Sequence, residues 1–232
     1  MPLKKWLESA SNAIEGILHA AKTQRHLRYH FYAAFAVLFL SFVMGVTKME
    51  FLVISIAVIL VLLAEMLNTA IEATVDLLSP ERSELARIAK DVAAGAVFIT
   101  SCGAAAIGVI VLYPYLGRIF ASGFSVAKHA GQDIAILSFV FVLIAVVLLK
   151  AHFGKGHPLS GGMPSGHSAL AFSVWIAITY ITGNYIASAL SLALAVAVAR
   201  SRVTKKIHRS FEVVAGGVLG AALTFALFRI FS

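Results

Sequence analysis

Long apolar segments follow one another through most of this 232-residue chain, and they restrict its possible folds more than any other feature. A membrane-spanning helix needs roughly 20 mostly apolar residues, and fewer where flanking Lys, Arg and aromatic side chains reach the interface. With 60% hydrophobic and 13% charged residues, the composition excludes a water-soluble globular domain. We therefore expect an all-α, polytopic helical membrane protein with about seven spans, at 31–47, 51–77, 92–114, 133–150, 167–182, 185–200 and 210–229.

The residues before the first span favour a helix that lies on the membrane surface. Between Leu3 and Lys22, apolar side chains recur at helical spacing, which is typical of an interfacial helix. The lysines at its start are not followed at once by a long apolar run, so a cleaved signal peptide is not expected. Cys102 is the single cysteine, which excludes a disulfide within the chain.

The least apolar connection, Gly117 to Gln132, predicts a division into two modules. Residues 1–117 would form a module with three spans, 118–132 a connector, and 133–232 a module with four spans. Within the second module, Gly183 and Asn184 split an uncharged run and predict a tight turn between two short helices.

The net charge of +8 has a simple interpretation in this topology. With the N-terminus in the cytoplasm, 15 of the 19 lysines and arginines lie on the cytoplasmic side, as the positive-inside rule requires. We expect an integral inner or plasma membrane protein whose N-terminus and polar loops face the cytoplasm.

Polar side chains line one face of the second predicted span. Glu65, Asn68, Glu72 and Asp76 fall within an arc of about 80° and extend about 16 Å along a helix. A carboxylate inside the membrane costs at least about 2.5–3.5 kcal/mol unless it is paired or faces water. A polar stripe that holds helices together is the alternative, but three carboxylates with no interleaved cation favour a functional site.

This segment resembles the prokaryotic diacylglycerol kinase family, which includes undecaprenol kinases. The resemblance covers roughly residues 5–115 and is carried by ExLNTAIExxVD from Glu65, followed by AKDVAAGAV from Ala89. It implies a homotrimer with composite sites that transfers the γ-phosphate of ATP to a lipid hydroxyl with Mg²⁺. It also implies that Glu65 is the general base, that Glu72 holds the metal, and that the nucleotide site is lined by Asn68, Asp76, Lys90 and Asp91.

Gln24 departs from the family pattern, because a second metal-binding glutamate is expected there. An amide oxygen can coordinate Mg²⁺ but brings no charge, so we expect either the metal affinity or the number of metal ions bound to differ from the family pattern.

A second constellation lies in the basic loops of the C-terminal half. It comprises Lys150-AHFGKG-His157-Pro158, then Pro164-Ser165-Gly166-His167 at a helix start, then Ser201-Arg202-VTKKI-His208-RSF-Glu212. These three parts resemble KxxxxxxRP, PSGH and SRxxxxxHxxxD of the type 2 phosphatidic acid phosphatase superfamily. A basic cytoplasmic loop is the alternative for the cations alone, but it does not explain the histidines and Glu212 in register.

The residue types suit a metal-independent phosphatase. Glu212, four residues after His208, can orient that imidazole as a nucleophile that becomes a phosphohistidine. His167 would protonate the leaving oxygen and then activate water. The phosphate would be bound by Lys150, Arg202, Ser165 and the backbone around Gly166.

Two residues and the span count depart from this pattern. His157 replaces an arginine, Glu212 replaces an aspartate, and four spans replace the family's usual six.

The sequence therefore predicts a bifunctional lipid-phosphate enzyme. Its kinase half would phosphorylate undecaprenol or diacylglycerol, and its phosphatase half would hydrolyse undecaprenyl diphosphate or phosphatidate. Membrane lipids and ATP are the expected partners, and nucleic acid is not. Two alternatives stay open: one half is catalytic and the other a scaffold, or the chain is a proton-coupled lipid transporter or binding protein.

Overall fold

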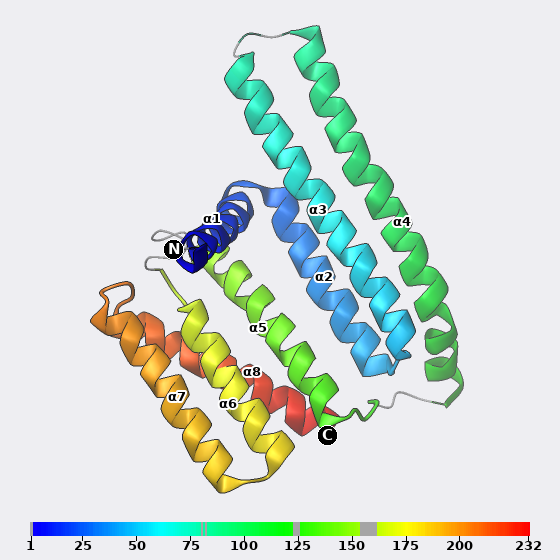
Figure 1. Ribbon diagram of the computed structural model, residues 1–232. Coiled ribbons are helices and arrows are strands. Elements are labelled where there is room, and N and C mark those ends of the chain that lie inside the picture. The colour runs from blue at the N-terminus through cyan, green and yellow to red at the C-terminus, as the bar shows by residue number, and fades with distance from the viewer. Residues whose placement is uncertain (1, 80, 82, 123–125, 154–161) are drawn as a thin grey trace. The chain divides into compact units, whose positions relative to one another are not determined.

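The computed structural model describes residues 2–79, 81, 83–122, 126–153 and 162–232, and this part of the chain contains eight α-helices and no strand (Figure 1). Six of the helices are long and apolar enough to span a membrane, whereas α6 is an apolar helix of 17 residues. The prediction of a polytopic helical membrane protein is confirmed. The helices are α1 Pro2–Thr23, α2 Arg25–Met44, α3 Lys48–Leu78, α4 Glu84–Ser122, α5 Gly131–Phe153, α6 Gly166–Thr182, α7 Tyr185–Thr204 and α8 Ser210–Phe231.

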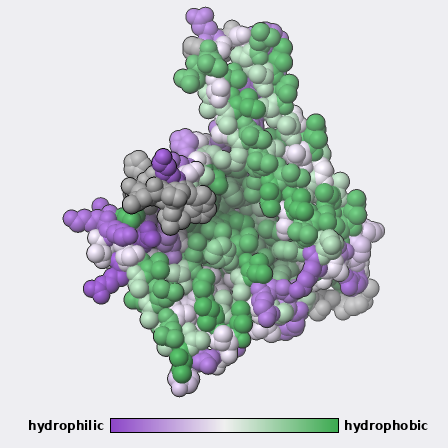
Figure 2. All heavy atoms as spheres, in the orientation of Figure 1, coloured by the Kyte–Doolittle hydropathy of each residue, from purple (hydrophilic) through white to green (hydrophobic). Residues whose placement is uncertain are grey.

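The helices form two compact units, Gln24–Ala127 and Met1–Thr23 with Lys128–Ser232. The surface helix α1 therefore belongs to the same unit as the C-terminal half, where it packs against α5. Apolar side chains cover the lengths of the helices, and hydrophilic side chains gather near their ends (Figure 2). This distribution fits helices that meet lipid along their sides and water at their ends.

The unit Gln24–Ala127 is built on two antiparallel pairings, α2 with α3 and α3 with α4. α2 ends at Gly45, whose left-handed backbone (φ 65°) lets its N–H bond to the carbonyl of Phe42. α3 then begins with a capping box. The backbone N–H of Glu50 donates to the hydroxyl of Thr47, and the backbone N–H of Thr47 donates to the carboxylate of Glu50. These caps close the hairpin within three residues and fix the two helices side by side.

α3 and α4 are longer than a membrane requires. At 1.5 Å per residue, the 31 residues of α3 rise about 46 Å, against roughly 30 Å of hydrocarbon. α4 continues to Ser122, through Pro114, into the region where the sequence predicts the connector. Both helices are therefore longer than the thickness of a bilayer core.

Backbone contact between α6 and α8 holds the other unit together. A Cβ atom on Gly220 would lie 1.8 Å from the carbonyl oxygen of Ala169, and one on Gly216 would lie 2.3 Å from that of Ser165. Glycine at these positions lets α8 approach α6 closely, as small residues do in membrane helix pairs. A hydrogen bond of 2.7 Å between the hydroxyls of Ser173 and Thr224 joins the same two helices.

The predicted turn between the short helices is confirmed. Gly183 ends α6 in the left-handed conformation (φ 57°), and the side chain of Asn184 accepts hydrogen bonds from the first backbone N–H groups of α7. In this unit α5, α6, α7 and α8 follow one another with alternating direction. The C-terminal ends of α5 and α7 thus lie at the same end as the N-terminal ends of α6 and α8.

Candidate active sites

The buried centre of the first site is the hydrogen-bonded pair of His208 and Glu212. His208 Nδ1 lies 2.8 Å from Glu212 Oε2, and only 2% of the histidine side chain is exposed. The carboxylate also accepts hydrogen bonds from the backbone N–H groups of Gly162 (3.2 Å) and Arg209 (3.2 Å). An ionised carboxylate only accepts, so Nδ1 carries a proton and donates it to this bond, and Nε2 is the ring nitrogen that the bond does not use. The predicted orientation of this imidazole by Glu212 is thus present in the geometry.

The turn between α7 and α8 places His208 over the end of α7. The backbone N–H groups of Ile207 and His208 both bond to the carbonyl of Arg202, at 3.1 and 3.2 Å. Lys206 adopts a left-handed backbone (φ 55°) that makes this return possible. Arg202 and His208 are consequently held within one hydrogen-bonded turn.

The start of α6 is anchored to the start of α8. The backbone N–H of Ser165 donates to the carbonyl of Glu212 at 2.9 Å, and Ser165 is fully buried. Its hydroxyl accepts a hydrogen bond of 3.2 Å from the hydroxyl of Ser168. Gly166 opens the helix after this residue, so the first N–H groups of α6 are directed to the same end as His208. His167 follows and is exposed.

Two cations complete this cluster. Lys150, in the last turn of α5, is only 7% exposed and interacts electrostatically with Glu212. The guanidinium Nε of Arg202 is buried and has no hydrogen-bond partner within the described residues. His167 interacts electrostatically with Arg202, His208 and Lys150. The predicted phosphatase residues therefore converge, except that His157 lies outside the described residues.

The second candidate site lies along α3, in the other unit. Glu65 is only 5% exposed, and within the described part of the chain its carboxylate has no hydrogen-bond partner. One turn later Asn68 Nδ2 donates to Glu72 Oε1 at 3.1 Å, so these two side chains form a pair. The side-chain oxygen Oδ1 of Asn68 is buried and has no hydrogen-bond partner among the described residues. The face predicted from the sequence is present, and its exposure increases from Glu65 toward Asp76.

The residues expected to hold Mg²⁺ offer oxygen donors of the kind that this ion prefers. The orphaned Asn68 oxygen lies beside the Glu72 carboxylate, which keeps acceptor capacity beyond its bond to Asn68. Gln24 caps α2 without a side-chain hydrogen bond to the helix. Gln24 lies 21 residues before Gly45, and Asn68 lies 21 residues after Thr47. Because the two helices are antiparallel, both residues lie at the same end of the hairpin. The described residues contain no group of three His, Cys, Asp or Glu suited to a metal.

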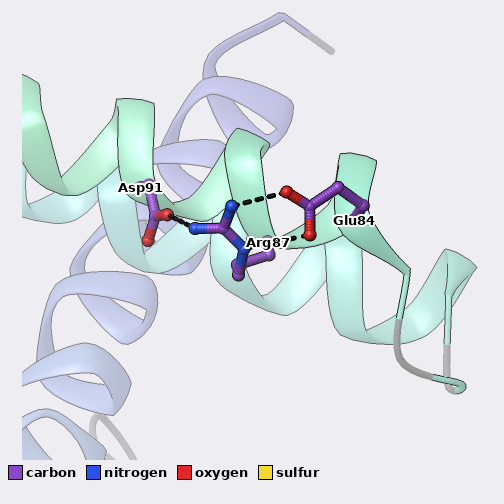
Figure 3. A network of polar contacts seen from close by, with 3 residues as sticks. All are labelled: Glu84, Arg87 and Asp91. Carbon is purple, nitrogen blue, oxygen red and sulfur yellow. Dashed lines mark hydrogen bonds and ion pairs between the residues drawn. The ribbon is translucent and has the colours of Figure 1, made fainter.

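A polar cavity of about 570 Å³ lies where α3 ends and α4 begins. Lys90 Nζ donates to Asp76 Oδ1 at 2.5 Å across this cavity. Arg87 also lines it and pairs with Asp91 (2.7 Å) and Glu84 (2.6 Å), as Figure 3 shows. The volume is in the range of small-molecule sites. The cavity thus groups three of the predicted nucleotide-site residues: Asp76 and Lys90 in its wall, and Asp91 through Arg87.

Some contributors were missed by sequence reasoning. Arg87 is not among the residues that the sequence predicts for the site, although its spacing of three and four residues from Glu84 and Asp91 is the signal for a helical ion-pair network. The N–H of Gly162 and the hydroxyl of Ser168 support the other site, and no residue pattern announces either contact.

Comparisons with known proteins agree with this geometry. The family model for prokaryotic diacylglycerol kinase matches residues 11–112, and that for the PAP2 superfamily matches residues 150–232. The undecaprenol kinase of Bacillus subtilis is 37% identical over 114 residues, which cover 49% of this chain and 93% of that protein. No solved structure gives a significant match.

Two further relatives carry the name diacylglycerol kinase. The protein from Synechocystis sp. is 37% identical over 111 residues, which cover 47% of this chain and 63% of that protein. The protein from Haemophilus influenzae is 34% identical over 96 residues, which cover 41% of this chain and 81% of that protein.

Helices, sites and comparisons together define an integral membrane enzyme that joins a lipid kinase domain to a PAP2 phosphatase domain. Through its N-terminal half, the chain belongs to the prokaryotic diacylglycerol kinase family.

Proposed function

We propose that both halves are active, so that one chain phosphorylates a membrane lipid alcohol with ATP and also hydrolyses a lipid phosphate or diphosphate. The observation that carries the proposal is the buried His208–Glu212 pair, held beside two cations in a unit other than the one that contains the kinase face. Two polar sites with different chemistry on a chain that has only 11 acidic residues are hard to explain by packing.

The phosphatase reaction follows from the side chains of its site. Nε2 of His208 attacks the phosphorus, the P–N bond forms, and the bond to the lipid oxygen breaks while His167 gives that oxygen a proton. His167 then takes a proton from water, whose oxygen attacks the phosphohistidine and releases phosphate as the P–N bond breaks. Arg202, Lys150 and the N–H groups at the start of α6 bind the phosphate oxygens in both steps.

The proposed kinase reaction assigns different roles to the buried and the exposed side chains along α3. Glu65, buried and without a hydrogen-bond partner in the described chain, takes the proton of the lipid hydroxyl as that oxygen bonds to the γ-phosphorus of ATP. The bond from this phosphorus to the bridging oxygen breaks, and ADP leaves. The cavity with Asp76, Lys90 and Arg87 accommodates the nucleotide. Glu72, Asn68 and Gln24 would hold Mg²⁺, which when bound neutralises phosphate charge.

Undecaprenol is the first choice for the alcohol, because a relative covered over 93% of its length carries the name undecaprenol kinase. Diacylglycerol is the second. For the phosphatase half we propose undecaprenyl diphosphate first and phosphatidate second, so that both reactions act on one pool of lipid. An apolar cavity of about 470 Å³ between α6, α7 and α8 is lined by Val203 and Val213, neighbours in sequence of the phosphate site, and suits a lipid chain.

We also propose that both sites face the cytoplasm, as the distribution of lysine and arginine predicts. Four spans, α2 to α5, separate Gln24 from the end of α5 at Lys150, and an even number of crossings returns to the same side. A homotrimer with composite kinase sites is the expected assembly. It is supported by the exposure of α4, because only 6% of the most apolar 18-residue stretch of this helix is buried within the chain.

Two assays on the protein purified in detergent test the proposal: transfer of label from γ-labelled ATP to undecaprenol or diacylglycerol, and phosphate release from lipid mono- and diphosphates. Glu65→Gln should abolish only the first activity and His208→Asn only the second. Glu15→Gln, on α1 outside the proposed nucleotide cavity, and His152→Asn, at an exposed position, are matched controls and should leave both activities intact.

Loss of neither activity in the two site variants would refute both assignments. Wild-type protein with phosphatase but no kinase activity would support a single catalytic half, for which the replacement of a metal-binding glutamate by Gln24 is the observation in favour. Neither activity, together with gradient-dependent lipid movement, would favour the transporter alternative.

A further inference from the structure

A groove on α3, between α2 and α4, is a cavity that the proposed reactions do not use. α2 and α4 both pack against α3, and a groove of about 450 Å³ remains between them. Small residues on α4 leave this room, because Ala104, Ala105 and Gly108 line the groove and a Cβ atom on Gly108 would meet nothing within 4 Å. Most of the other lining side chains are valine, leucine and alanine. The groove is therefore suited to a hydrocarbon.

The groove begins at the depth of the proposed general base. Lys90 on α4 donates to Asp76 on α3, and a second hydrogen bond near the other end of this helix pair keeps the same alignment to within one residue. Ser101, which lines the groove, lies 11 residues after Lys90 on α4. Glu65 lies 11 residues before Asp76 on the antiparallel α3, so Ser101 and Glu65 are at the same level. From there the groove continues to Leu116, about 22 Å along α4.

The hydroxyl at this end of the groove is available to a ligand. Ser101 Oγ is buried and has no hydrogen-bond partner within the described residues. Serines inside other spans, Ser41, Ser55 and Ser138, each donate to the carbonyl four residues earlier in their own helix. A buried hydroxyl without a partner costs free energy, which a ligand that carries an oxygen recovers. The apolar groove thus has a donor for an alcohol at the level where Glu65 can accept the proton of that alcohol.

The dimensions of the groove match a single chain. A volume of about 450 Å³ distributed over about 22 Å gives a mean cross-section of about 20 Å², which admits one extended hydrocarbon chain and not two side by side. A polyprenol has one chain, whereas a diacylglycerol has two. A lipid with two chains must leave one of them outside the groove and gains less from burial.

We propose that this groove binds the chain of a polyprenol and thereby selects the lipid alcohol of the kinase. This inference rests on the proposed kinase activity. Ser101 donates a hydrogen bond to the alcohol oxygen, whose proton Glu65 takes. The chain lies along Ala104, Ala105 and Gly108, so small residues of α4 determine specificity at a distance from the reacting atoms.

The test compares three variants of the full chain in detergent. Gly108→Leu fills the groove about 10 Å beyond the level of Glu65. Gly103→Leu is the matched control, because its Cβ also has open space but Gly103 does not line the groove. Gly108→Leu should lower kcat/KM for undecaprenol about tenfold, and that for prenol, an alcohol of one isoprene unit that ends before Gly108, less than about twofold. Gly103→Leu should change neither value.

Ser101→Ala should lower kcat/KM about tenfold for both alcohols, because each needs the same hydrogen bond at its oxygen. Its thermal unfolding midpoint should not fall, since the hydroxyl has no partner in the described chain. A lower midpoint with unchanged kinetics would assign Ser101 a structural role and contradict this part of the proposal.

Wild-type kinetics with undecaprenol in Gly108→Leu would overturn the proposal, and so would an equal loss with prenol or in Gly103→Leu, which would indicate disturbed packing. Absence of kinase activity in the wild type would refute the proposed function instead.

Photolabelling then decides the role of the groove separately. A polyprenol analogue with a diazirine on its chain should label α4 between Ala104 and Leu112, and undecaprenol should displace it. Displacement by phosphatidylglycerol at the same concentration would indicate a general lipid groove and overturn the proposal. Absence of label, with an oligomeric mass that changes in Gly108→Leu, would show that a helix of a second copy fills the groove and would overturn it too.

Discussion

The two candidate sites differ in how completely one chain builds them. In the phosphatase site, the His208 and Glu212 side chains are 2% and 16% exposed, and three hydrogen bonds hold the carboxylate. In the kinase site, the Asp76 side chain is 67% exposed and that of Lys90 35%. The first site is preorganised within its unit, whereas the second presents its groups on a helix surface. This difference is the one expected if neighbouring copies complete the kinase site and not the phosphatase site.

Packing explains the contrast. α8 touches α6 through glycine backbone, so the loops at their ends are fixed relative to each other. α3 and α4 pair along much of their length, but at the kinase site most residues at the end of α3 and at the start of α4 are exposed. Four predictions test this comparison.

The largest effect is expected from Glu212→Gln. The variant loses the charge that stabilises the imidazolium, and its amide can donate as well as accept, so it no longer fixes the tautomer of His208; phosphatase kcat should fall about 10²- to 10⁴-fold. Glu212→Asp should keep much more activity, because the charge remains. Phosphate release from a lipid phosphate measures both. Equal activity in Glu212→Gln and the wild type would show that the buried pair has only a structural role.

Gly220→Ala should be the next most damaging change. Its new Cβ would meet the Ala169 carbonyl at 1.8 Å, so α8 must move away from α6, at a cost of about 1–3 kcal/mol. Because α6 carries Ser165 and His167, phosphatase activity should fall about tenfold as the site loosens. The thermal unfolding midpoint in detergent should fall too. Gly103→Ala, which has open space for its Cβ, is the control; a similar loss there would contradict the packing argument.

Asn68→Ala should change the metal dependence of the kinase. It removes the orphaned oxygen beside Glu72 and the hydrogen bond that holds this carboxylate, so the Mg²⁺ concentration for half-maximal activity should rise about tenfold. A titration of labelled-phosphate transfer against Mg²⁺ measures it, with Thr69→Ala as the neighbouring control. A rise in the KM for ATP with unchanged Mg²⁺ dependence would assign Asn68 to the nucleotide instead.

The smallest effect is expected for the Asp76–Lys90 pair. A double-mutant cycle on thermal unfolding, with Asp76→Asn and Lys90→Met, should give a coupling of about 1 kcal/mol or less, because both side chains reach solvent. The same cycle on His208 and Glu212 should give a larger value. Equal couplings would remove the distinction between a preorganised and an open site.

The sequence was sufficient for what depends on local spacing. Helical periodicity placed Glu65, Asn68 and Glu72 on one face, and the interval of four residues between His208 and Glu212 predicted their hydrogen bond. Apolar run length predicted seven spans, of which six are helices long enough to cross a membrane and α6 is shorter, and Gly183 predicted a turn.

Contacts between distant segments could not be predicted in this way. The packing of α1 with α5 depends on which apolar face finds a complementary surface, and an amphipathic pattern does not specify its partner. The approach of Gly216 to Ser165 joins residues far apart in sequence, and glycine in a membrane helix has no single meaning. The unpartnered groups of Asn68 and Arg202 become visible only when every neighbour is placed.

The length of α3 bears on how two substrates of opposite solubility can meet. A lipid alcohol stays within the bilayer and a nucleotide stays in water, so a catalyst that serves both must hold groups on each side of the boundary. Glu65 is buried, the side chain of Asp76 is largely exposed, and about 16 Å of one helix separates the two residues. Under the proposed function, the lipid stays in the bilayer and the nucleotide stays in water. This is possible because α3 extends from the apolar interior of the membrane to the aqueous phase between the general base and the nucleotide site.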